Sequence, residues 1–256
     1  MIRFFRTLRQ RLLAENRVSR YLLYAVGEIV LVVIGILIAL QINNWNEARK
    51  TQRKTNAYLV MLSDEIKTNL RLLDRSKTMA EEHRAYNMKT MQVFNSDSAR
   101  TLDLDTFYDL TVMKGPFNKM ELVRSSFDDL INSGALENVR DSTLRNQVFS
   151  IESAFKRYEK EYDAVWMVWE QQIRPYHLEH LNESILITRF RNMPEIDFDT
   201  DFNAFIYNRT YANMLSGNII FISNYLIAIA GIQKRLTVIL HNIESYLNND
   251  PSKEKE

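Results

Sequence analysis

The longest apolar stretch of the chain runs from residue 21 to residue 42 and contains one formal charge, Glu28. A helix needs about 20 apolar residues to cross the roughly 30 Å hydrocarbon layer of a membrane, and this stretch has that length. A secretory signal would have a shorter apolar core followed by small residues, whereas this run ends in the sequence ALQINNW at residues 39–45. We therefore expect a retained transmembrane helix at 21–43, and a buried helix of a soluble protein is the alternative.

Basic residues are more frequent before this stretch than after it. Six arginines lie within residues 1–20, and four Lys or Arg residues lie within 49–54. Because basic flanks stay on the cytoplasmic side, we predict a cytoplasmic N-terminus and a periplasmic domain, anchored in the inner membrane of a Gram-negative cell. Apolar residues at helical spacing within 1–20 also predict an amphipathic segment along the anionic inner leaflet.

Helical periodicity continues beyond the apolar stretch. No Gly or Pro occurs between Gly35 and Gly115, so nothing interrupts a long first helix. Leucine and isoleucine recur there at spacings of three and four residues, which marks one apolar helix face: Leu59, Leu62, Ile66, Leu70 and Leu73.

Turn-forming residues divide the rest of the chain. A loop is expected after Phe94, and a short helix should then run to the Lys-Gly-Pro sequence at 114–116. Apolar residues at 122–131 predict another helix, which ends where Gly134 suits a left-handed cap. Asp141 or Ser142 should cap a long helix that Pro175 kinks or divides. The last helix is expected to follow a loop at 192–195 and to run from residue 200 or 201 to about 247.

Three long helices with apolar faces, joined by shorter ones, are most simply packed as an antiparallel bundle. The predicted fold class is therefore all-α, with one N-terminal transmembrane helix before the bundle. The predicted organisation is an amphipathic segment at 1–20, the transmembrane helix at 21–43, the bundle at 44–248 and a disordered tail at 249–256.

The last helix contains a second apolar run, IIFISNYLIAIAGI at residues 219–232. Fourteen residues are too few for a comfortable membrane crossing, and Gln233, Lys234 and Arg235 follow directly. We expect a buried helix of the bundle, with a second transmembrane helix as the alternative.

Composition narrows the classes of function. The chain has 256 residues, a net charge of +1 and no cysteine. The lack of a long basic stripe argues against nucleic acid as a partner, and the lack of cysteine excludes disulfides and thiolate chemistry. Only 6 Gly and 4 Pro agree with a chain built mostly of helices.

Two sections of the chain resemble a known protein family. The opening IRFFRTLRQRLLAENRVSRYLLYAVGEIVLVVIGILIALQINNWNEARK resembles that of an uncharacterised group of bacterial single-span envelope proteins, catalogued as a domain of unknown function. The segment SSFDDLINSGALENVRDSTLRNQV resembles the middle section of the same group. The resemblance implies a single-span envelope protein and brings no catalytic residue or cofactor.

Candidate metal ligands occur in two places. His177 and His180 lie at i and i+3, with Glu183 one turn further, but no matching Glu-x-x-His sequence occurs elsewhere. Aspartates alternate at 197–201 as in a calcium loop, yet Phe202 and Asn208 occupy the positions that require Gly and Glu. We predict neither a metal nor another cofactor.

The most prominent aromatic feature is a stripe of four residues at helical spacing. These side chains could line a pocket for a small apolar or cationic ligand, or they could pack in the core, which is the commoner arrangement. The candidate pocket residues are Tyr158, Tyr162, Trp166 and Trp169.

The apolar stretch itself carries residues that simple anchoring does not require. Gly27, Gly35 and Ala39 share one helix face, and a small residue every fourth position allows close approach of a second helix. One hypothesis is a homodimer or docking on a partner's membrane helix, with Glu28 hydrogen-bonded across the contact. The alternative is a plain anchor in which Glu28 reaches back to the cytoplasmic interface beside Arg20.

No nucleophile elbow, phosphate-binding glycine loop or zinc-protease motif is present in the sequence, and we predict that the protein is not an enzyme. The leading interpretation is a membrane-anchored helical bundle that acts as a scaffold or interaction element of the bacterial envelope. The alternative is a sensory or ligand-binding input module coupled through the transmembrane helix. The cytoplasmic segment of about twenty residues is too short for an output domain, which favours the scaffold.

Overall fold

The computed structural model describes residues 18–111, 117–185 and 199–249, and these ranges contain helices and no strand. The expected all-α class is confirmed. The chain divides into two units. The first contains residues 1–56 and the last five residues, and the second contains residues 57–251. The long helix α2 (Val18–Phe94) contributes to both units. Predictions for residues 1–17, for the Lys-Gly-Pro sequence at 114–116, for the loop at 192–195 and for the tail from 250 onward lie outside the described residues.

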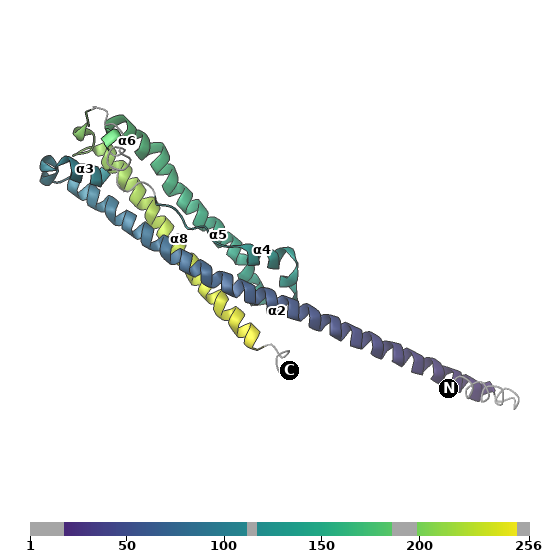
Figure 1. The fold of residues 1–256 in the computed structure, drawn as a ribbon. Coiled ribbons are helices and arrows are strands. Elements are labelled where there is room, and N and C mark those ends of the chain that lie inside the picture. The colour runs from purple at the N-terminus through teal and green to yellow at the C-terminus, as the bar shows by residue number, and fades with distance from the viewer. Residues whose placement is uncertain (1–17, 112–116, 186–198, 250–256) are drawn as a thin grey trace. The chain divides into compact units, whose positions relative to one another are not determined.

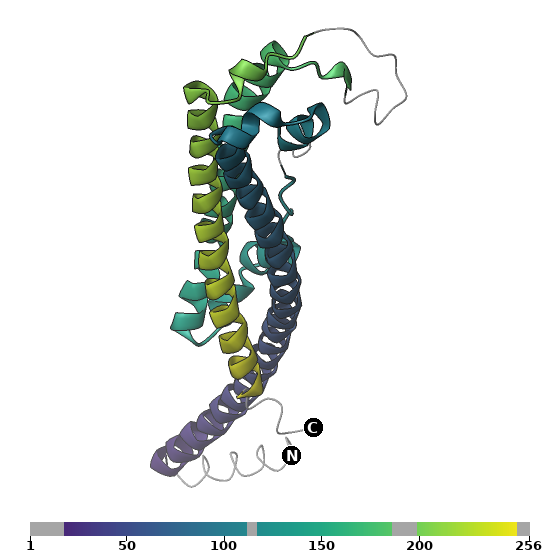
Figure 2. The same ribbon diagram turned by 90° about the vertical axis from the view of Figure 1, so that its left-hand side faces the viewer.

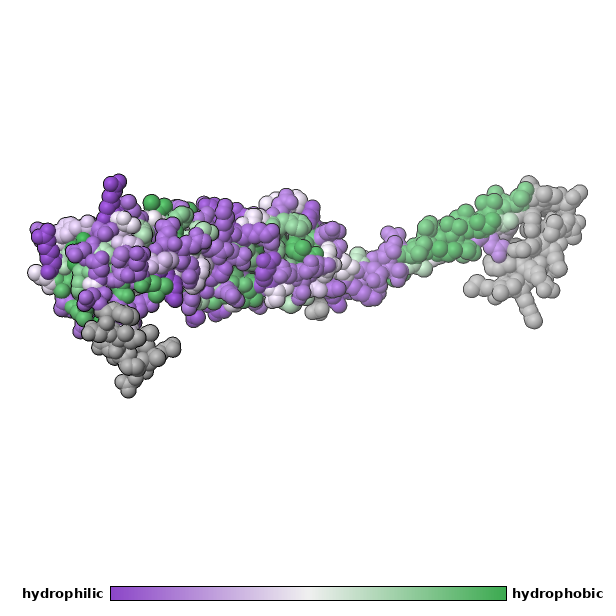
Figure 3. Space-filling model, turned by 90° about the horizontal axis from the view of Figure 1, so that it is seen from above, coloured by the Kyte–Doolittle hydropathy of each residue, from purple (hydrophilic) through white to green (hydrophobic). Residues whose placement is uncertain are grey.

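In the first unit, α2 presents an apolar surface on every side. Residues 22–42 are exposed except for the half-buried Ala25, and none of the most apolar 18-residue window is buried. Figure 3 shows this part of α2 as a nearly unbroken hydrophobic surface. By length and composition, this part of the helix is able to cross a membrane.

The second unit contains three long helices, the part of α2 from residue 57 onward, α5 (Ser142–Val168) and α8 (Arg209–Asn248). Figures 1 and 2 show α8 alongside α2. Gln233 of α8 donates to Asp74 of α2 at 2.6 Å, and Asn242 donates to Gln147 of α5 at 2.7 Å.

With the Lys67–Glu244 ion pair at 3.1 Å, the first contact shows that α8 is antiparallel to α2. Arg235 donates to the carbonyl of Ser150 at 2.9 Å, which with the second contact shows that α8 is also antiparallel to α5. The helices α2 and α5 are therefore parallel to each other, which refines the expected antiparallel bundle. A parallel pair needs a connection that returns along the bundle, and the described residues 104–111 and 117–141 belong to it (Figure 1).

Apolar faces of the three long helices form the main core, as their periodicity predicts. All five apolar residues that mark the face of the first helix pack in or against this core. Twelve residues of α8 are buried, which agrees with the expectation of a core helix, although α8 also passes the composition test for a membrane helix. A second cluster, around Phe107 and Phe205, lies where α3 (Leu104–Thr111) meets the segment before α8.

The connection between α2 and α5 differs from the sequence prediction. The helix expected over 122–131 is α4 (Ser125–Asn132), and residues 117–124 form neither a helix nor a strand. The reason is that side chains of α2 and α5 satisfy the backbone groups of this segment, as described below, so a helix is not needed to pair them.

Two other boundaries also differ. The loop expected after Phe94 includes a short 3₁₀ helix, η1 (Asp97–Thr101), before α3. The last helix begins at Arg209, because the side chain of Asn208 accepts from the amides of Thr210 and Tyr211 and so caps the helix there. The 3₁₀ helix η4 (Phe202–Ala204) lies directly after the predicted start, and Asp201 is its N-cap.

Three predictions about helix ends and breaks are confirmed. The carboxylate of Asp141 accepts from the amides of Thr143 and Leu144 and caps α5. After α5 the chain forms a π-helix, η3 (Trp169–Ile173), and then α6 (Arg174–His180), so the long helix is divided close to Pro175. Gly134, between α4 and η2 (Ala135–Asn138), has φ of 69° in the left-handed region.

The left-handed backbone at Gly134 gives a testable prediction. We expect Gly134→Ala to lower the free energy of unfolding by about 1 kcal/mol, because a Cβ is strained at positive φ. Gly134→Asn should cost less, since asparagine tolerates this region better. Urea unfolding of the detergent-solubilised chain measures both, and equal stability of Gly134→Ala and wild type would contradict the assignment.

Candidate functional site

A row of buried polar residues on α2 faces the connection between α2 and α5. Asn69, Ser76, His83 and Thr90 are spaced by seven residues, and each is at most 5% exposed. Seven residues of helix span about 10.5 Å, which is close to the length of three residues of extended chain. We call this row the polar seam. Its successive residues can therefore contact every third residue of an extended segment that runs beside α2.

The polar seam binds the backbone of the connection. The side-chain amide of Asn69 donates to the carbonyl of Val123 at 2.6 Å and accepts from its N–H at 2.8 Å. Seven residues further along α2 and three residues back along the connection, Ser76 accepts from the N–H of Met120 at 3.2 Å.

The next two members of the polar seam contact earlier parts of the connection. The ring of His83 lies 5.3 Å from that of Phe117, and Thr90 donates to the carbonyl of Leu110 at 3.0 Å. From Leu110 to Val123, the described part of the connection is therefore held along one line of α2.

Two residues of the predicted aromatic stripe hold the same segment from α5. Tyr158 donates to the carbonyl of Met120 at 2.8 Å, and Tyr162 donates to the carbonyl of Phe117 at 2.7 Å. Both rings are buried in the main core, and burial raises the pKa of both hydroxyls above the ordinary value. These two tyrosines thus have a structural role in the described structure.

The other two residues of the stripe lie elsewhere. The side chain of Trp166 is 39% exposed at the surface of α5. Trp169, at the start of η3, is half-buried and lines a small cavity. The four aromatic residues therefore do not line one common pocket, and Trp169 is the member that borders a cavity among the described residues.

A buried carboxylate, which the sequence analysis missed, fixes the start of α4. Glu65 of α2 is 6% exposed and accepts from the N–H groups of Ser126 and Phe127 at 2.6 and 3.2 Å. The hydroxyl of Ser125 also lies 3.3 Å from this carboxylate. Because a helix N-terminus carries unpaired N–H groups and a partial positive charge, a carboxylate from another helix is an effective cap.

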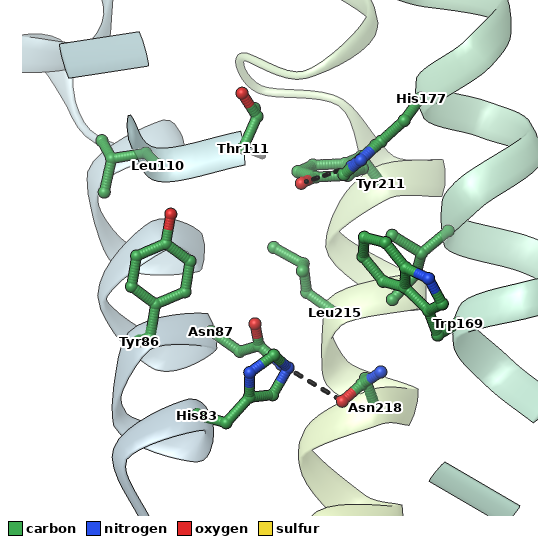
Figure 4. Close-up of a pocket in the computed structure, with 11 residues that line it drawn as sticks. His83, Tyr86, Asn87, Leu110, Thr111, Trp169, His177, Tyr211, Leu215 and Asn218 are labelled. Atoms are coloured by element: carbon green, nitrogen blue, oxygen red, sulfur yellow. Dashed lines mark hydrogen bonds between the residues drawn. The ribbon is translucent and has the colours of Figure 1, made fainter. Parts of the chain in front are cut away.

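The cavity lies at the end of the second unit where α3, η3, α6 and the start of α8 meet α2 (Figure 4). Asn87 of α2 donates to Asn218 of α8 at 3.2 Å across it, and His177 of α6 lies 3.1 Å from the hydroxyl of Tyr211. The space for a water-sized molecule is about 10 Å³, enough for about one water. The lining residues are His83, Tyr86, Asn87, Leu110, Thr111, Trp169, Ile173, His177, Tyr211, Leu215 and Asn218.

The structure separates the two histidines that formed the candidate metal pair. His177 is 2% exposed inside the cavity, whereas Nδ1 of His180 lies 3.8 Å from a carboxylate oxygen of Asp201. Within residues 18–111, 117–185 and 199–249 no three His, Asp or Glu side chains are grouped so that they could hold a metal ion. Asp197, one of the aspartates considered for calcium, lies outside the described residues.

Burial of His177 predicts a pH dependence of stability. Burial lowers the pKa of His177 from 6.5 to about 4, so the unfolded chain binds this proton more readily than the folded one. The stabilisation is complete above pH 6.5 and is lost as the pH falls toward 4, by roughly 3 kcal/mol.

Urea unfolding between pH 4 and pH 7.5 tests this prediction. The His177→Gln variant, in which residue 177 does not titrate, should lose about 3 kcal/mol less than wild type over the same range. Identical pH profiles of the two chains would show that His177 does not carry the effect.

The residues of the predicted membrane-packing face lie on the exposed surface of the first unit. Gly27, Glu28, Gly35 and Ala39 are all exposed, and a Cβ added at either glycine would meet nothing within 4 Å. The close approach of a second helix at this face, and the role of Glu28, stay predictions.

A protein-family model matches this chain. A family of unknown function, DUF6090, matches residues 28–160, and neither a curated protein nor a solved structure matches the sequence. The match leaves out the basic start, on which part of the resemblance rested, and includes the whole middle section at 125–148. It contains most of the apolar stretch, the polar seam and the extended connection. Since the match covers more than half of the sequence, the chain belongs to the DUF6090 family.

Proposed function

We propose that the protein is a single-span membrane protein of the bacterial envelope, anchored by residues 21–43. The exposed, mostly apolar surface of α2 over 22–42 supports this, because such a surface is stable in a lipid bilayer and not in water. Trp45 follows directly and is 63% exposed, and the guanidinium of Arg49 lies 5.7 Å from its ring centroid. A Trp with a nearby Arg is typical of the interface between lipid and water.

The proposed role of residues 57–249 is contact with other proteins, as a scaffold or assembly element on the periplasmic side. The observation that carries this role is that the interior is held in place by many contacts, while single apolar side chains are left exposed on an otherwise hydrophilic surface (Figure 3). The connection is bound from both α2 and α5, while Ile220 and Ile227 of α8 are more than half exposed at the surface. Exposed apolar side chains are typical of protein interaction sites where they gather.

A sensory or ligand-binding role is the second candidate, and η3 favours it. A π-helix is uncommon and frequently occurs at functional sites, and both Trp169 and Ile173 of η3 line the cavity. Since the cavity has room for about one water, a larger ligand would require it to open.

The anchor makes a direct prediction for membrane association. We expect the double variant Ile34→Lys and Leu37→Lys to leave the membrane pellet after alkaline carbonate washing, because each Lys costs about 3 kcal/mol at the centre of a membrane helix. Wild type and the control pair Val60→Lys and Met61→Lys, exposed apolar residues of the second unit, should stay in the pellet. Retention of the first variant would contradict the anchor.

Copurification from mild detergent, followed by mass spectrometry, tests the contact role. A protein partner recovered at near-stoichiometric yield supports the scaffold. A tightly bound small molecule without a protein partner would favour the sensory role.

A further inference from the structure

The outward face of α8 carries an apolar stripe with the spacing of a helix-packing seam. Gly217, Ile220, Asn224, Ile227 and Gly231 follow one another at steps of three and four residues, so they share one face, and we call them the outer stripe. Ile220 and Ile227 are 60% and 61% exposed, and Asn224 and Gly231 are also exposed.

Nothing inside the second unit accounts for the two glycines of the outer stripe. A Cβ added at Gly217 or Gly231 would meet nothing within 4 Å, and neither residue has a positive φ. Glycine in the middle of a helix is less stable than alanine, so its presence at both ends of an exposed isoleucine pair needs another explanation. Small residues at this spacing let a second helix approach closely.

Charge does not oppose the approach of an identical helix. No charged residue occurs from Thr210 to Gln233, a stretch that contains the whole outer stripe. The one polar residue within the stripe is Asn224, whose amide both donates and accepts hydrogen bonds and can therefore pair with the same residue of another copy.

We propose that two copies of the chain associate through the outer stripe, with Asn224 of each copy at the two-fold axis. The pattern is nearly symmetric about Asn224, with isoleucines four residues before and three residues after it and glycines seven residues away on both sides. A two-fold interface uses the same surface of both copies, so a self-complementary pattern fits a second copy of this chain. A polar Asn within an apolar seam fixes the register of such a pair.

The expected dimer is weak outside the membrane. A single helix pair buries less than the roughly 1,200 Å² of typical stable interfaces. Confinement of both copies to one membrane raises their effective concentration. The test uses membranes because it rests on the proposed anchor. Retention of the protein in the carbonate-washed pellet is therefore checked first. Loss of the protein from this pellet would contradict the anchor and not the dimer.

Disulfide crosslinking in isolated membranes tests the dimer, because the chain has no cysteine of its own. We expect Asn224→Cys to give a covalent dimer as the main species after mild oxidation, whichever direction the two helices take, since a residue at the axis meets itself. Phe149→Cys on α5, at 54% exposure, is the matched control and should give at least fivefold less dimer.

A second variant separates the dimer from folding. Gly231→Leu, added to Asn224→Cys, should lower the dimer yield at least fivefold, because the larger side chain blocks close approach. The melting midpoint of this variant should not fall, since the added side chain points into open space. Equal dimer yields from Asn224→Cys and Phe149→Cys would overturn the proposal. The absence of a dimer, together with a thiol at 224 that lipid shields from a water-soluble reagent, would also overturn it.

Discussion

Replacing Glu65 with alanine is expected to lower the free energy of unfolding by about 4 kcal/mol. The buried carboxylate accepts two backbone N–H bonds from the first turn of α4, at Ser126 and Phe127, and hydrogen bonds to a charged group contribute about 1.5–3 kcal/mol each. The variant also leaves these N–H groups buried without their acceptor. Urea unfolding of the detergent-solubilised chain at pH 7, followed by tryptophan fluorescence, measures the change.

The neighbouring acidic residue is the matched control. Asp64 is exposed and lies 3.8 Å from Lys67, so Asp64→Ala should change stability by less than about 0.5 kcal/mol. Glu65→Gln should lose less than Glu65→Ala, because one side-chain oxygen is kept. If Glu65→Ala and Asp64→Ala were equally stable, the helix-capping role would be wrong.

The second large effect is expected at Asn69. Asn69→Asp should lower the free energy of unfolding by about 4 kcal/mol, because a carboxylate oxygen would replace the amide that donates to Val123 and would lie against its carbonyl. The site is 1% exposed, so water cannot solvate the new charge. The same urea titration measures the loss, which should decrease below pH 5 as the carboxyl group becomes protonated.

Asn146→Asp provides the control for the same chemical change at the surface. This residue is exposed near the start of α5, so the variant should change the stability by less than about 0.5 kcal/mol. Equal effects at the two asparagines would contradict the role of Asn69 in holding the extended connection.

The long helices could be predicted from the sequence because their signals are local. The absence of Gly and Pro up to Gly115 and the spacing of the leucines indicate a long first helix, and α2 extends to Phe94. Asp141 caps α5 through its own neighbours, and Gly134 adopts the left-handed region that its type favours. Each of these features depends on residues within one or two helical turns.

The extended connection could not be predicted, because the residues that hold it are distant in sequence. Val123 pairs with Asn69, which is 54 residues earlier, and apolar residues near Val123 by themselves suggest an earlier start of α4. The sequence feature that could have indicated the connection is the spacing of seven residues between Asn69, Ser76 and His83. This spacing marks a second, polar line on the first helix. Such a line also fits an ordinary solvated face until burial is known.

The aromatic stripe shows the limit of spacing arguments. Each step of four residues turns a helix by about 40°, so Trp166 lies about 80° from Tyr158 and reaches the surface. The next residue of the stripe, Trp169, begins the π-helix η3 and borders the cavity. A π-helix has no clear sequence signal, so the cavity could not be predicted from the sequence.

The central claim is that residues 21–43 cross a membrane and place the helical bundle on the periplasmic side. The most direct test is a pair of reporter fusions after Glu256, one with alkaline phosphatase, which is active only in the periplasm, and one with a fluorescent protein that matures in the cytoplasm. We predict an active phosphatase and a dark fluorescent fusion. An inactive phosphatase with a bright fluorescent fusion would contradict the account.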